Sequence, residues 1–89
     1  MEIAFLPQAE RDYEYWEKSG NVKIRKRILK LLEDIKLHPF TGIGKPEPLK
    51  HNLKGVWSRR INYEHRILYR IEDDMIYVYV LSMRFHYGH

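Results

Sequence analysis

The sequence predicts an α+β domain in which an opening strand and two helices are followed by an antiparallel sheet. Three observations lead to this class. Apolar residues recur at helical spacing in two stretches between residues 8 and 37, apolar and aromatic residues dominate three short stretches between residues 56 and 84, and turn-forming residues separate them. With 89 residues and no internal repeat or linker, we expect a single domain over residues 1–89.

Residues 2–6 form the predicted opening strand, and Pro7 follows it. Proline suits the first turn of a helix, where its missing N–H costs nothing. Gly20 is a suitable C-terminal stop for this first helix. The apolar face of the helix carries Ala9, Tyr13 and Trp16.

A second helix is predicted after Asn21, which can cap it, and His38-Pro39 ends it. Lysine and arginine residues fill the gaps between its apolar positions. A solvated basic face explains them better than a dedicated RNA-binding helix. The apolar positions are Ile24, Ile28, Leu31, Leu32 and Ile35.

Residues 38–55 hold three of the four prolines and three of the five glycines, so we expect a long ordered loop of the kind that often carries function. Three strands are predicted after it, and Asp73-Asp74 joins the last two as a hairpin. In the middle strand, Arg66, Leu68 and Arg70 face away from the helices. The three strands are Val56–Asn62, His65–Glu72 and Met75–Arg84.

Charge is unevenly distributed along the chain. The net charge is +4 and the isoelectric point is near 9.4. Between Lys45 and Arg70 there are seven Lys or Arg residues against two Glu. This stretch favours a polyanionic partner, with nucleic acid ahead of a membrane surface.

Several classes of function are excluded or disfavoured. Without cysteine there are no disulfides, thiolate metal sites or cysteine nucleophiles, and a reducing cytoplasm is the expected location. We expect no signal peptide and no membrane span. Lys45 precedes Pro46, which argues against a phosphate-binding P-loop. His86 and His89 have chelating spacing but no nearby carboxylate or thiol, so no metal site is predicted.

A dispersed set of residues has the chemistry for cutting RNA without a metal. The 2′-OH must lose a proton, the departing 5′-oxygen must gain one, and the phosphorane needs cations beside it. An aromatic ring can stack on a splayed base. Solvated loop acids, surface arginines, an Arg66–Glu64 pair and a terminal histidine explain the same residues. The set is Glu47, Arg59, Arg60, Arg66, His86 and Tyr87.

Longer blocks of sequence resemble the YoeB (Txe) toxins of the RelE superfamily, over nearly the whole chain. The blocks are Gly44-Lys45-Pro46-Glu47-Pro48-Leu49-Lys50-His51-Asn52-Leu53, Gly55-x-Trp57-Ser58-Arg59-Arg60-Ile61, Glu64-His65-Arg66-Ile67-Leu68-Tyr69, the terminal Arg84-Phe85-His86-Tyr87, and the early Tyr13-x-Tyr15-Trp16.

The resemblance implies a microbial-ribonuclease-like fold and a toxin that cuts messenger RNA in the A site of the 70S ribosome. It implies a neutralising antitoxin of the YefM/Axe type, a homodimer in some members, and no cofactor. Glu47 would be the general base, Arg66 would steady the phosphorane, and His86 would be the general acid that leaves a 2′,3′-cyclic phosphate. Tyr87 would place the substrate, and phosphates would be held by Lys50, Arg59 and Arg60.

The extension Gly88-His89 departs from relatives that stop at the His-Tyr pair, and it adds a second histidine three residues after His86. Two other functions stay open. The protein could occupy RNA without cutting it, which predicts a steep salt dependence of binding. Alternatively, its main role could be to pair with an acidic partner protein.

Overall fold

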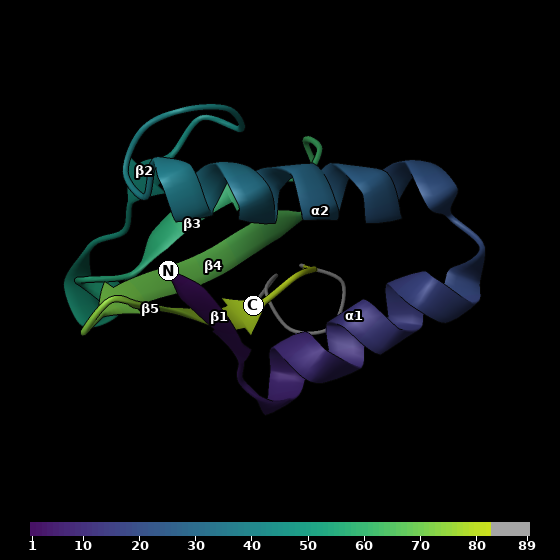
Figure 1. The fold of residues 1–89 in the computed structure, drawn as a ribbon, viewed down its shortest axis with the longest axis horizontal. Helices are drawn as coiled ribbons and strands as arrows, with labels where there is room; N and C mark the ends of the chain where they lie inside the picture. The colour runs from purple at the N-terminus through teal and green to yellow at the C-terminus, as the bar shows by residue number, and fades with distance from the viewer. Residues whose placement is uncertain (83–89) are drawn as a thin grey trace.

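The computed structural model describes residues 1–82, and these form two helices and a five-stranded sheet. Both helices pack on one face of the sheet (Figure 1). This confirms the predicted α+β class. In chain order the elements are β1 (Glu2–Phe5), α1 (Pro7–Ser19), α2 (Val22–Leu37), β2 (Glu47–Pro48), the 3-10 helix η1 (His51–Leu53), β3 (Trp57–Arg60), β4 (Arg66–Glu72) and β5 (Met75–Val80).

The helix boundaries follow from the predicted signals. Pro7 lies in the first turn of α1, and Gly20 ends that helix with a left-handed φ of 77°. The Asn21 side chain accepts a hydrogen bond from the backbone N–H of Ile24, so it caps α2 as expected. His38 is the C-cap residue of α2. All five predicted apolar positions of α2 are buried.

The sheet has the order β1-β5-β4-β3-β2. β3, β4 and β5 pair antiparallel with one another, as predicted. β2, which was not predicted, adds antiparallel to β3, and β1 pairs parallel to β5 and makes the sheet mixed. Asp73 and Asp74 both have positive φ, which is the geometry of a tight hairpin turn. Strand β5 ends at Val80, earlier than predicted, because Leu81 turns its backbone toward α1.

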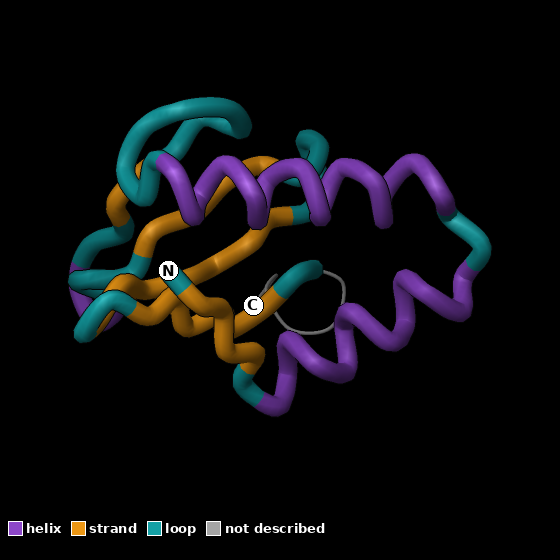
Figure 2. The backbone as a smooth tube through the Cα atoms, in the orientation of Figure 1, coloured by secondary structure: helices purple, strands orange, loops and turns teal. Residues whose placement is uncertain are grey.

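The connection between α2 and β3 is more ordered than the predicted loop. It contains β2 and η1, and it doubles back beside the C-terminal end of α2 (Figure 2). The core lies between the helices and the inner face of the sheet, where Ile67, Tyr69, Ile76 and Val78 are fully buried. The opposite face of the sheet, here called the outer face, carries the remaining side chains of β4.

Candidate functional site

The sheet register brings three of the predicted site residues to the outer face. Glu47 lies opposite Ser58, which lies opposite Leu68, and Arg60 lies opposite Arg66. Directly opposed residues share a face, and alternate residues of a strand return to it. Because Ile67 and Tyr69 point into the core, this outer set points away from the helices.

Glu47 and Arg66 are close enough to contact one small group. They are separated by two strand spacings and two residues along the strand, which corresponds to about 12 Å between their Cα atoms. Both side chains are long and project on the same side. A phosphate lying between them is therefore within reach of a carboxylate from one edge and a guanidinium from the other.

The guanidinium of Arg66 is held by the connection between β3 and β4. Its Nη1 donates to the carbonyl oxygens of Asn62 at 3.1 Å, Tyr63 at 3.4 Å and His65 at 3.5 Å. Its Nε and Nη2 have no hydrogen-bond partner within residues 1–82. These contacts fix the arm and leave donors available for an anion.

Arg60 and Arg66 form a cross-strand pair of like charges. They are directly opposed, and neither has a carboxylate partner among the described residues. Such a pair is destabilising unless an anion lies against it. Glu47 lies on the same face, and its exposed carboxylate also has no ion pair within residues 1–82. The three charges fit an anionic ligand that carries a removable proton.

The prediction that Arg59 holds an RNA phosphate is wrong for this structure. Its side chain is fully buried, on the inner face opposite Ile67, because neighbouring residues of a strand face opposite sides. Nη1 contacts Asp34 Oδ2 at 2.5 Å. Nε donates to the Tyr69 hydroxyl at 3.2 Å, and the remaining donors go to the carbonyl oxygens of Ile43, Thr41 and His38. Every nitrogen of this guanidinium is occupied.

Arg59 thereby fixes the loop that leads to Glu47. The same Asp34 oxygen accepts from the backbone N–H of Ile43 at 3.1 Å. Gly42 packs so closely there, with a φ of 116°, that a Cβ would lie 2.1 Å from that oxygen. The carbonyl oxygen of Gly44 accepts a hydrogen bond from the backbone N–H of Arg60 at 2.7 Å. Three residues later, the chain enters β2 at Glu47. Arg59 is thus a positioning residue for the site.

The hydrogen bond from Arg59 lowers the pKa of Asp34 below its ordinary value near 3.8, against the opposing effect of burial. A depressed carboxyl pKa contributes stability that is complete above the unfolded value and is lost as the pH falls through the folded value. We therefore expect acid to weaken this pair below about pH 4.

An Asp34→Asn variant tests this pH dependence. The wild-type protein should lose free energy of unfolding more steeply than the variant as the pH falls from about 5 to 2, because only the wild type gains a proton at this position. Urea denaturation at a series of pH values measures both curves. Parallel curves over this range would contradict the role given to the pair.

The chain after β5 is anchored to α1. Asp12 is fully buried, and its Oδ2 accepts from the backbone N–H of Leu81 at 2.9 Å. Trp16 Nε1 donates to the carbonyl oxygen of Leu81 at 3.0 Å, and Ser82 Oγ lies 3.3 Å from His65 Nδ1. The described part therefore ends beside His65, the residue that precedes β4. The predicted site residues His86 and Tyr87 lie outside the described residues.

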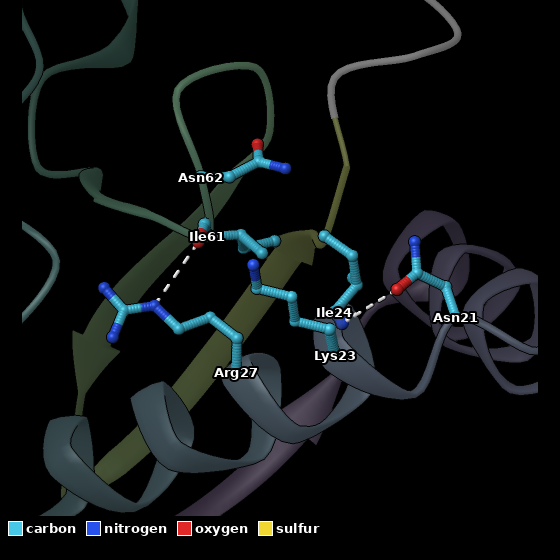
Figure 3. A pocket seen from close by; sticks show the side chains of 6 residues that line it. All are labelled: Asn21, Lys23, Ile24, Arg27, Ile61 and Asn62. Carbon is cyan, nitrogen blue, oxygen red and sulfur yellow. Dashed lines mark hydrogen bonds between the residues drawn. The ribbon is translucent and has the colours of Figure 1, made fainter.

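Lys50, the remaining predicted site residue within residues 1–82, is exposed and directly precedes η1. Between α2 and the β3–β4 connection is a pocket of about 460 Å³, in which Arg27 Nε donates to the carbonyl oxygen of Ile61 at 3.3 Å (Figure 3). The side chains of Lys23 and Asn62 also line it, so the pocket is basic on its rim. Sequence reasoning assigned these lysine and arginine residues only to a solvated face.

Residues 1–82 contain no cluster of three His, Cys, Asp or Glu side chains that could hold a metal ion. Within the same part of the chain, neither helix has the length and apolar character that a membrane span requires.

A family model for the YoeB-like toxin of bacterial type II toxin-antitoxin systems matches residues 5–87. The chain belongs to this family. Toxin YoeB of Synechocystis sp. is 51% identical over 88 residues, covering 98% of both chains. Two Staphylococcus aureus structures are also similar. The chain in the heterotetrameric YoeB-YefM complex matches with a TM-score of 0.86 at 44% identity, and the match covers 96% of this chain and 95% of that one. The chain in the YoeB dimer matches with a TM-score of 0.85 at 43% identity, and the match covers 98% of each chain.

Proposed function

We propose that this YoeB-family toxin is an endoribonuclease that cuts messenger RNA in the ribosomal A site by metal-independent acid–base chemistry. The observation that carries the proposal is the convergence of Glu47, Arg60 and Arg66 on the outer face, with the two cations opposed and unneutralised within residues 1–82. A phosphodiester supplies both the anion that this pair needs and, on its 2′-OH, a proton for the carboxylate.

The proposed reaction is an internal transfer at phosphorus. Glu47 takes the proton of the 2′-OH, whose oxygen attacks the adjacent phosphorus. Arg66 stabilises the phosphorane that forms, using the donors that the β3–β4 connection leaves free. The bond to the 5′-oxygen breaks as that oxygen takes a proton from His86. The products are a 2′,3′-cyclic phosphate and a 5′-hydroxyl end.

Arg60 and Lys50 are assigned to neighbouring phosphates, and Tyr87 to placement of the substrate. Arg59 is withdrawn from this group because its donors are used internally. The role of His86 rests on the family resemblance, and this residue lies outside the described part of the chain.

The proposed partners are a YefM/Axe-like antitoxin and a second copy of the chain. Support comes from the similar Staphylococcus aureus proteins, one in a YoeB-YefM complex and one as a YoeB dimer. The basic outer face is complementary to an acidic antitoxin segment. The ribosome and a cytoplasmic location belong to the same proposal.

Mapping the ends of messenger RNA tests the activity. Expression of the protein should produce new 3′ ends inside codons of translated messages, and Arg66→Ala and His86→Ala should each abolish them while circular dichroism stays native. Protection of RNA without new ends would favour the binding function instead. Unchanged translation on expression alone would favour a protein whose main role is pairing with its partner.

A further inference from the structure

A second pocket of about 420 Å³ lies on the outer face, beside the proposed catalytic residues. Its walls come from η1, β4 and β5. Leu68 belongs to it and is two residues from Arg66 on the same face of β4, about 7 Å away along the strand. The lining residues are Asn52, Leu53, Lys54, Val56, Leu68, Arg70, Tyr79 and Val80.

A register shift in the sheet helps to form this pocket. Strands β4 and β5 change register between Leu68 and Tyr69, so that Val80 lies opposite Leu68 while Val78 lies opposite Tyr69. Val78 is buried in the core, and Val80 instead lines the pocket with Leu68. The shift therefore produces an apolar floor on a face that is otherwise charged.

Cationic groups border this floor. The guanidinium of Arg70 lies 5.9 Å from the centre of the Tyr79 ring, and its Nη2 donates to Glu72 at 3.2 Å. Its Nε is buried and has no hydrogen-bond partner within residues 1–82. A buried donor without an acceptor costs free energy, which a ligand with an acceptor at this position would recover. Lys54 adds a second positive charge at the rim.

We propose that this pocket binds the base of a nucleotide next to the scissile linkage. A flat ring with acceptor atoms on its edge matches an apolar floor, an aromatic wall and an unsatisfied arginine donor. The phosphate attached to that base would then lie toward Arg66. The inference rests on the proposed ribonuclease function and deepens it, since the pocket gives the site a means of choosing among bases.

Filling the pocket tests the inference. Leu68→Trp occupies the floor from the outer face, and Arg70→Gln removes the guanidinium charge and its Nε–H without adding bulk. Met75→Trp, on the same face at the β4–β5 turn, is the matched control. Each is assayed on ribosomes carrying messages that differ only in the bases flanking the cut. Both pocket variants should raise KM about tenfold, leave kcat within about twofold, and flatten the base preference at one flanking position. The control should keep the wild-type profile.

A binding measurement separates this inference from the ribonuclease proposal. Short RNA with 2′-deoxy substitution at the linkage cannot be cut, and its binding is followed by fluorescence anisotropy. If the wild type cuts no RNA, yet both pocket variants weaken this binding, then the pocket stands and the proposed activity fails. If the wild type cuts RNA and both variants keep its base preference, the pocket assignment is wrong. It is equally overturned if both variants lose only antitoxin binding. Arg70→Gln decides the matter should Leu68→Trp fail to fold.

Discussion

Glu47→Gln should lower kcat for messenger cleavage by about 10²- to 10⁴-fold, because the amide cannot accept the proton of the 2′-OH. The substitution is nearly isosteric at an exposed position, so the fold and KM should change little. Single-turnover cleavage on programmed ribosomes measures the chemical step directly.

The matched control for this variant is Glu17→Gln, which makes the same chemical change at an exposed position of α1. It should cleave at the wild-type rate. If Glu47→Gln also cleaved within threefold of wild type, the base would have to be another group, and the assignment carried by the sheet register would be lost.

Arg59→Met should lower the free energy of unfolding by about 3–5 kcal/mol, because it leaves the Asp34 carboxylate and the loop carbonyl oxygens without their donor. This is a large share of the roughly 4–13 kcal/mol expected for a chain of this length. Urea denaturation gives the value, and thermal unfolding should shift down by at least about 12 °C.

Arg60→Met is the control for stability, because the side chain of Arg60 is exposed on the outer face, unlike that of Arg59. Its free energy of unfolding should stay within about 0.5 kcal/mol of wild type. Equal losses in the two variants would mean that loss of the Asp34 pair is not the cause. A destabilised Arg59→Met protein that still cleaves RNA at low temperature would agree with a positioning role.

The helices were predictable because their signals are local. The Asn21 cap and the five apolar positions of α2 each lie within about one turn of the next, and periodicity reports them directly. Strand β2 was not predictable in the same way. It has two residues, one of them Pro48, and its pairing with β3 comes from tertiary context rather than from strand propensity.

The candidate site was predictable only in part. Residue chemistry and family resemblance identified the residues of the site. Only the pairing register of the strands showed that they share one face of the sheet. Arg59 was misplaced because its partner Asp34 is 25 positions away in the chain and no local pattern links them. Strand alternation was the signal that could have separated it from Arg60. The pocket at Leu68 and Val80 depends on a register shift that no sequence pattern marks.

The shortness of β2 has a consequence for self-association. An exposed sheet edge normally offers a row of N–H and C=O groups on which another polypeptide can build a further strand. Here the edge has two residues, Pro48 has no N–H to offer, and Pro46 precedes it. Intermolecular sheet growth is therefore blocked at the border where Glu47 stands.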